Sequence, residues 1–458
     1  MGPVVSAKDF RDLWAEGKAA RESLPRSAQG VFRPTERDPI AVLEAEHASR
    51  IASLVPERVG RMQASPFAFY RGSAAVMAHD LAPEPHTGAP LVVCGDAHLG
   101  NFGLYATPER ALTFELNDFD EATVGPWEWD VKRFATSLVV GGEDIGLGRT
   151  EAAEVVRHAI GVYRDQLDRL GQKTVLERFS HREPLPDASA GHDVEAVVRA
   201  TVDRAARRSS DAGLARLVDV DADGVPRLVK QPLAAVHEED ASLDLALGLF
   251  RAYRRTARAD VALLLGQFRL VDVVLRVVGV GSVGTRCYLS LLVGPSGERL
   301  LLQTKEAEPS VLETFGGLPP FVETFGADPD RVDAPQGYRV VSAQRVMQSA
   351  SDAFLGHFRH EGRDYYVRQF RDMKGSVRLD ALTPAQFRAH AAQCAALLAR
   401  AHAQSPNVAF VCGYLGSDTR FDDAMTAWAL AYADQVDRDF AALSAAVSSG
   451  RLPSSRTD

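Results

Sequence analysis

The spacing of apolar residues changes twice along the chain and divides it into a helical, a β-rich and a second helical part. Apolar residues recur at intervals of three and four in the first and last parts, whereas β-branched runs dominate the middle. We expect parts over 1–267, 268–372 and 373–447, followed by a disordered tail over 448–458. The expected helices cover residues 40–54, 57–63, 129–140, 149–170, 193–217, 243–267, 338–348, 384–402 and 422–447.

The β-rich part contains five short apolar runs separated by turn residues. Glycine, proline and serine punctuate the runs, as expected for antiparallel strands joined by short turns. The expected strands cover residues 270–278, 287–293, 299–306, 354–359 and 365–370. This pattern predicts an α+β protein with a small antiparallel β lobe.

Two further short strands precede the β-rich part, and each ends in polar residues. Leu91–Cys94 leads into Gly95 and Asp96, and Leu112–Leu116 leads into Asn117 and Asp118. We expect the two strands to form a small hairpin-like platform that carries both polar segments.

Composition excludes several classes of protein. The 458 residues carry a formal net charge of -9, which argues against a general nucleic-acid binder. The four cysteines are scattered without a CxxC pair, so neither a disulfide framework nor structural zinc is expected. No run approaches the ~20 apolar residues that span a bilayer, and the first residues lack the apolar core of a signal peptide. A cytoplasmic protein with no membrane partner is the simplest expectation.

The polar segments carry the residue types that phosphoryl transfer to a hydroxyl requires. Asp96 is followed five positions later by Asn101, and Asp118 and Asp120 come after the second strand. In such chemistry one carboxylate orients the nucleophile, while an Asn and an Asp hold the metal that bridges the nucleotide phosphates. We therefore assign Asp96 to the acceptor hydroxyl and Asn101, Asp118 and Asp120 to Mg²⁺. The alternative is a polar turn that satisfies its own amides.

Three neighbouring residues have supporting roles in this interpretation. His98 lies inside the first segment without a second His nearby, which favours a structural role or a substrate contact over metal ligation. Asp130 begins an apolar helix and is expected to hold the backbone of the first segment, unless it only complements the helix dipole. Arg71 lies in the aromatic cluster Ser65–Gly72, for which core packing is favoured over a position near a phosphate or an acidic catalytic residue.

A glycine-rich turn in the β part is a candidate phosphate-binding element. Gly279, Gly281, Ser282 and Gly284 lie between two strands, and Lys305 lies on the next strand. Backbone amides of such a turn can cover phosphates, and the lysine can reach them from below. Because a buried lysine needs an anionic partner, Glu313 is our candidate, with Glu308 and Glu323 as alternatives.

These motifs resemble those of protein-kinase-like folds, in particular aminoglycoside phosphotransferases, in an unusual order. The Gly-Asp-x4-Asn segment, the strand-end Asp118 and the helical Asp130 precede the glycine-rich turn, which suggests a circular permutation of the two-lobed fold. The whole-chain pattern is also similar to a bacterial family known as domain of unknown function 2252. Its signatures include Phe-Tyr-Arg-Gly and Asn-Asp-Phe-Asp-Glu, and the resemblance covers most of residues 35–445.

The resemblance implies a nucleotide between the lobes, with residues 368–374 as a hinge. Backbone groups near Gln369 to Asp372, including Phe370, would then meet the adenine edge. The expected function is ATP- and Mg²⁺-dependent transfer of a phosphoryl group to a hydroxyl of an acceptor that the sequence does not identify. A catalytically inactive nucleotide-binding module and a transferase of AMP on the same scaffold are the alternatives.

Overall fold

The structure is a computed structural model that describes residues 8–109, 111–182, 217–229, 235–236, 242–277, 279, 281, 283–326, 332–370 and 375–455. It is a mixed α+β protein with small antiparallel sheets, as the sequence pattern predicts. The division into domains at the expected boundaries stays a prediction. The expected helix over 193–217 lies outside the described residues up to residue 216.

Helices form most of the first and last parts of the chain. Those before the β-rich part are α1 (Phe10–Ser23), α2 (Pro39–His47), α3 (Val55–Met62), α4 (Pro66–Gly72), α5 (Ala74–Leu81), α6 (Trp127–Asp144), α7 (Arg149–Gly171), α8 (Val175–Ser180), α11 (Leu243–Thr256) and α12 (Ala259–Leu265). Those within the β-rich part are α13 (Val311–Thr314), α14 (Phe321–Thr324) and α15 (Pro335–Met347), and those after it are α16 (Pro384–His402), α17 (Val408–Leu415) and α18 (Arg420–Ser448). Helix α16 begins with a capping box between Thr383 and Gln386, which satisfies two N-terminal donors.

The five strands expected in the β-rich part are confirmed. They belong to a sheet with the order β11-β12-β10-β9-β8-β7, in which all the pairs are antiparallel. Its strands are β7 (Ala235–Val236), β8 (Arg269–Arg276), β9 (Cys287–Val293), β10 (Arg299–Glu306), β11 (Gly356–His360) and β12 (Arg363–Gln369). The sixth strand, β7, comes from the part of the chain that precedes the expected small lobe.

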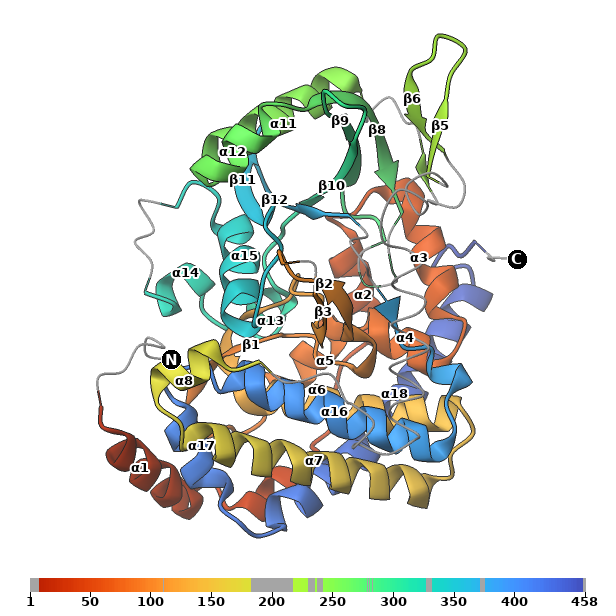
Figure 1. The fold of residues 1–458 in the computed structure, drawn as a ribbon. Helices are drawn as coiled ribbons and strands as arrows, with labels where there is room; N and C mark the ends of the chain where they lie inside the picture. The colour runs from red at the N-terminus through yellow and green to blue at the C-terminus, as the bar shows by residue number, and fades with distance from the viewer. Residues whose placement is uncertain are drawn as a thin grey trace.

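The sheet is covered differently on its two faces. Helices α11 and α12 pack on the face that carries Leu300 and Leu302 (Figure 1). The opposite face carries Leu301 and packs against the hairpin of β5 (Val218–Val220) and β6 (Pro226–Leu228). Because side chains alternate along a strand, Lys305 shares the face of Leu301. The lysine therefore points away from α11 and α12.

The two polar segments cross between two small sheets. Strand β1 (Pro90–Val93) pairs with β4 (Thr123–Pro126), and β2 (Phe102–Ala106) pairs with β3 (Leu112–Leu116) and β13 (Gly375–Ser376). The expected platform of β1 paired with β3 is therefore wrong. Each strand pairs with a strand that the local sequence pattern does not indicate. Both polar segments connect one sheet to the other.

The C-terminal residues form part of the fold, so the expectation of a disordered tail is wrong for the described residues 449–455. The Ser455 N–H donates to the Pro56 carbonyl at 3.0 Å, and Arg451 forms ion pairs with Asp38 and Glu44, each at 2.7 Å. Leu452 is buried in the main core. These contacts hold the end of the chain on α2 and α3.

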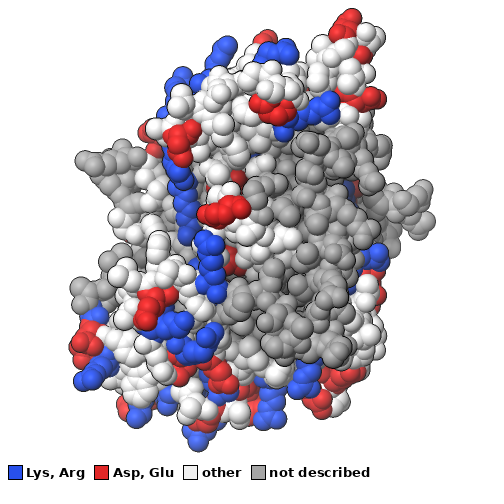
Figure 2. Space-filling model, in the orientation of Figure 1, with Lys and Arg blue, Asp and Glu red and all other residues white. Residues whose placement is uncertain are grey.

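Three global expectations can be compared with the structure. The four cysteines are buried free thiols, which agrees with the absence of a disulfide framework. Within the described residues, no helix combines the length and the apolar character needed to cross a bilayer. On the face drawn in Figure 2, acidic and basic side chains of the described residues are interspersed rather than gathered into a basic patch.

Candidate functional site

The two polar segments lie against each other. The backbone N–H of Asn117 donates to the Asn101 carbonyl at 3.0 Å, and the Asn101 side-chain amide donates to the Asp96 carbonyl at 2.5 Å. Gly95 permits this approach because its φ is +78° and a Cβ there would lie 2.0 Å from the Glu121 carbonyl oxygen. The close contact of the segments places Asp96, Asn101 and Asp118 around one space.

Asp130 holds the first segment from beneath. Its two carboxylate oxygens accept the backbone N–H groups of Cys94 and Gly95 at 2.6 and 2.8 Å. The His402 imidazole lies 3.1 Å from the same carboxylate, and the Tyr163 hydroxyl lies 2.8 Å from the other ring nitrogen of His402. A buried carboxylate with these partners orients the backbone that carries Asp96.

The Asp96 carboxylate is held between Arg133 and His98. One oxygen accepts a hydrogen bond from Arg133 Nε at 2.8 Å, and the other faces His98 Nε2 at 3.6 Å. Burial raises the pKa of Asp96, and the charge of Arg133 opposes this rise only in part. A raised pKa moves a carboxylate toward the range that suits a general base near neutral pH.

His98 is held as a neutral side chain. Its Nδ1 accepts the Gly100 N–H at 3.0 Å, which assigns the ring proton to Nε2 on the side of Asp96. Burial lowers the pKa of His98 far below its ordinary value, and the charges of Arg71 and Arg133 lower it further. The geometry gives His98 a structural position next to Asp96.

Lys305 reaches the second polar segment. Its Nζ forms an ion pair with one oxygen of Asp120, whose other oxygen accepts the Tyr366 hydroxyl at 2.8 Å. The Asp120 N–H donates to Asp118 at 3.4 Å. Burial lowers the pKa of Lys305 to about 8, although the charge of Asp118 opposes this shift. The structure therefore brings together two motifs that lie 185 positions apart.

Glu313 is not the anionic partner of Lys305 that the sequence analysis predicted. Its carboxylate accepts hydrogen bonds from the Thr123 hydroxyl at 2.9 Å and the Phe321 N–H at 3.1 Å. It thus joins β4 to the start of α14 and does not line the cavity of Lys305. Asp120 takes the place expected for Glu313, because the strand-end segment approaches β10 more closely than the chain that follows it.

Arg50 contacts described residues of the glycine-rich turn. Arg50 donates to the carbonyls of Gly281 and Val283 at 2.9 and 2.6 Å, and Gly284 adopts a φ of +92°. A Cβ added at Gly279 would meet no other atom of the described residues within 4 Å, so the surroundings of this glycine are open. Ser282 lies outside the described residues. The described carbonyls bind Arg50, which anchors the turn to the end of α2.

Two adjoining cavities form the candidate site. The larger, of about 290 Å³, is lined by Lys305, Glu308 and Phe315, and the smaller, of about 30 Å³, by Asp96, Asn101 and Asp118. The residues common to both walls are Glu46, Asp120, Glu121 and Gly281. Because the two cavities share these residues, a ligand bound beside Lys305 would lie next to the carboxylates of the smaller cavity.

The comparison with known proteins places this site within one family. A family model described as "Uncharacterized protein conserved in bacteria (DUF2252)" matches residues 50–446. The chain belongs to this family. No curated protein and no solved structure matches the chain significantly. The DUF2252 match includes Asp96, Asp118 and Lys305, whereas Glu46, which lines both cavities, precedes the matched residues.

If Asn101, Asp118 and Asp120 bind a metal, they supply only part of its coordination shell. Within the described part of this DUF2252 chain, no three His, Cys, Asp or Glu side chains are grouped so that they could hold a metal ion. The expected set of Asn101, Asp118 and Asp120 contains only two carboxylates. Mg²⁺ commonly takes one or two carboxylates and completes its shell with phosphate oxygens and water, and these residues fit that arrangement.

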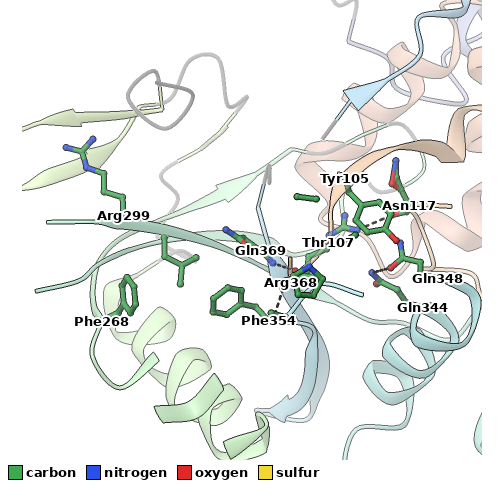
Figure 3. A pocket seen from close by; sticks show the side chains of 15 residues that line it. Tyr105, Thr107, Asn117, Phe268, Arg299, Gln344, Gln348, Phe354, Arg368 and Gln369 are labelled. Carbon is green, nitrogen blue, oxygen red and sulfur yellow. Dashed lines mark hydrogen bonds between the residues drawn. The ribbon is translucent and has the colours of Figure 1, made fainter. Parts of the chain in front are cut away.

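The backbone N–H groups of the two residues predicted to meet the adenine edge already donate to other protein groups. The Gln369 N–H donates to Asp352, and the Phe370 N–H donates to the Leu301 carbonyl at 2.9 Å, so both donors are already used. Gln369 lines a third cavity of about 310 Å³, where Figure 3 shows it beside Arg368 and Phe354. Residues 371–374 of the expected hinge lie outside the described residues.

Several site residues were missed by sequence reasoning. Arg133 pairs with Asp96 from the second turn of α6, and the Glu121 carboxylate accepts the Val311 N–H at 2.6 Å. Burial raises the pKa of Glu121 to about 7. Both could have been found from the sequence, because Glu121 ends the Asn-Asp-Phe-Asp-Glu signature and Arg133 follows Asp130 in the same helix. Glu46 carries no comparable signal, because only tertiary packing brings α2 to the cavity.

Proposed function

We propose that the protein is an ATP- and Mg²⁺-dependent phosphotransferase that acts on a hydroxyl group. One observation carries the proposal: Asp96, Asn101 and Asp118 line a cavity that adjoins the one lined by Lys305 and Gly281, and Asp120 belongs to both walls. Phosphoryl transfer needs these residue types around one centre, with little covalent chemistry left for the protein.

The same arrangement supports a kinase-like fold with permuted connectivity. The glycine-rich turn joins β8 to β9, and Lys305 lies on β10, the next strand of the sheet. In protein kinases a glycine-rich turn covers the phosphates and the phosphate-binding lysine lies on the third strand. Here the segment with Asp96 precedes that sheet in sequence but lies against Lys305 through Asp120. A circular permutation accounts for both facts.

The proposed reaction exchanges one P–O bond for another. The acceptor oxygen forms a bond to the terminal phosphorus of ATP, and the bond from that phosphorus to the bridging oxygen breaks, so that its electron pair leaves with ADP. Asp96 accepts the proton of the acceptor hydroxyl, and Lys305 binds the phosphates that become ADP. Mg²⁺, when bound by Asn101, Asp118 and Asp120, would neutralise phosphate charge.

Nucleotide binding tests the proposal directly. We expect calorimetry to show binding of ATP that strengthens when Mg²⁺ is added. Lys305→Ala should weaken it about tenfold or more because a buried charge contact with phosphate is lost, and Asp118→Ala should remove most of the Mg²⁺ effect. Lys18→Ala and Asp223→Ala, both at exposed positions, are matched controls for the two changes.

The outcomes separate the candidate functions. Absence of ATP binding to the wild-type protein would contradict the proposal. Binding with formation of ADP during an acceptor screen supports phosphoryl transfer, whereas release of pyrophosphate would indicate AMP transfer. Binding without turnover of any acceptor would favour a nucleotide-binding switch.

The lowered pKa of Lys305 predicts proton uptake on binding. Near pH 8 the free lysine is partly neutral, and phosphate favours its charged form. At about pH 8.5 nucleotide binding should therefore take up a proton, and affinity should fall as pH rises further. The measurement is the binding heat in two buffers of different ionisation enthalpy. Lys305→Arg, which stays charged, should abolish the uptake; equal uptake in this variant would assign the proton to another group.

A further inference from the structure

Arg71 extends from the last turn of α4 into the smaller cavity. Helix α4 begins at Pro66 after Ser65, whose hydroxyl accepts the Ala68 N–H at 3.2 Å. Near its other end, the Tyr70 hydroxyl donates to the Arg133 carbonyl at 2.8 Å, and Arg133 donates back to the Tyr70 carbonyl at 2.6 Å. The residue before Arg71 is therefore fixed to the helix that carries the partner of Asp96.

Three other arginines of the site each have a carboxylate partner. Arg133 binds Asp96, while Arg58 and Arg50 both bind Glu46, at 2.8 and 2.6 Å. By contrast, the buried Nε of Arg71 has no hydrogen-bond partner among the described residues, and no ion pair of its guanidinium is found there. The guanidinium lines the cavity together with Asp96, Asn101 and Asp118.

A guanidinium that lines a cavity and has no partner among the described residues is suited to bind an anion there. Burial lowers the pKa of Arg71, while the charges of Asp96 and Asp118 oppose this shift. The two carboxylates stabilise the cation from a distance, but they do not use its donors. A phosphoryl group presents oxygens that match the fork of a guanidinium, and the positive charge would offset the repulsion between that group and the two carboxylates.

We propose that Arg71 binds the terminal phosphoryl group of the nucleoside triphosphate. This assignment rests on the proposed phosphotransferase function and adds a residue to it: Lys305 serves the phosphates that remain with the leaving nucleotide, and Arg71 serves the group that is transferred. The small cavity contains both Arg71 and Asp96, so the bound phosphoryl lies beside the carboxylate that receives the acceptor proton.

Gly100 makes room for this side chain. A Cβ at Gly100 would lie 3.3 Å from Arg71 Nε and 3.1 Å from the His98 ring. Gly100→Ala therefore crowds the guanidinium while leaving the arginine in the chain. It offers a second way to disturb Arg71 without creating an empty space where the side chain was.

Comparison of ATP with ADP isolates the terminal phosphoryl. Calorimetry with Mg²⁺ on the full chain should show that Arg71→Met weakens ATP binding about tenfold or more and leaves ADP binding unchanged, because only ATP carries the contacted group. Arg71→Lys should retain part of the preference, and Gly100→Ala should reduce it. Arg61→Met, on the half-buried face of α3, is the matched control and should change neither affinity.

The outcomes distinguish this inference from the function on which it rests. If the wild-type protein binds neither nucleotide, the proposed function fails and the role of Arg71 fails with it. If both nucleotides bind and Arg71→Met weakens them equally, or weakens neither, the role of Arg71 is overturned while nucleotide binding stands. If Arg71→Met does not fold, as circular dichroism would show, the ratio of ATP to ADP affinities in Arg71→Lys and Gly100→Ala decides: an unchanged ratio overturns the assignment.

Discussion

Asp96→Asn is expected to lower the rate of ATP turnover by about 10²–10⁴-fold while Mg²⁺–ATP binds with nearly unchanged affinity. Asparagine keeps the shape of the side chain and one oxygen that can accept the hydrogen bond from Arg133 Nε, now 2.8 Å long. It loses the charge and the basicity with which Asp96 would receive the acceptor proton. The measurement is ADP formation with an acceptor found by screening, together with calorimetric affinity for ATP.

Asparagine is a sharper test than alanine at this position. Asp96→Ala leaves the buried Arg133 without its carboxylate, so a loss of activity would combine catalysis with stability. Asp223→Asn, on the exposed turn between β5 and β6, controls for the same chemical change elsewhere. Equal losses of turnover and of ATP binding in Asp96→Asn would show that Asp96 holds the nucleotide and would contradict its role as a base.

The β strands were predictable because their signal is local. Residues 287–293 and 299–306 combine apolar runs with a Pro-Ser-Gly-Glu turn, and the strands β9 and β10 have these bounds. The helix expected over 243–267 is interrupted at Ala257 and Arg258, where the chain takes extended backbone angles between α11 and α12. The helical spacing of apolar residues continues across residues 257 and 258, so the sequence pattern alone does not indicate the break between the two helices.

Non-local pairing explains the errors in the site. The partners of β1 and β3 were wrong because both short strands have apolar character but no feature that selects a neighbour. The partner of Lys305 was missed for the same reason: Glu313 is close in sequence, whereas Asp120 comes close only when the sheet packs against the polar segments. Residues within one motif could be grouped from spacing, but contacts between motifs required the fold.

Loss of the Asp130 carboxylate is expected to destabilise the protein by about 3–5 kcal/mol, the range for breaking a buried charged contact. Asp130→Ala would leave the N–H groups of Cys94 and Gly95 buried without their acceptor, and would remove the partner of His402. Each unsatisfied buried donor costs about 1–3 kcal/mol. The measurement is the free energy of unfolding from urea titration, followed by circular dichroism.

Asp130→Asn separates the two parts of this effect. An amide retains one acceptor oxygen for Cys94 or Gly95 but presents N–H₂ to the other, so its destabilisation should be smaller than that of alanine yet still measurable. His402→Ala removes the contact with the carboxylate and the hydrogen bond with Tyr163 but leaves the Cys94 and Gly95 N–H groups with their acceptor, so it should cost less than Asp130→Ala. A destabilisation by His402→Ala as large as that by Asp130→Ala would place the main stabilising contact in the helices α7 and α16 rather than in the backbone of the Asp96 segment.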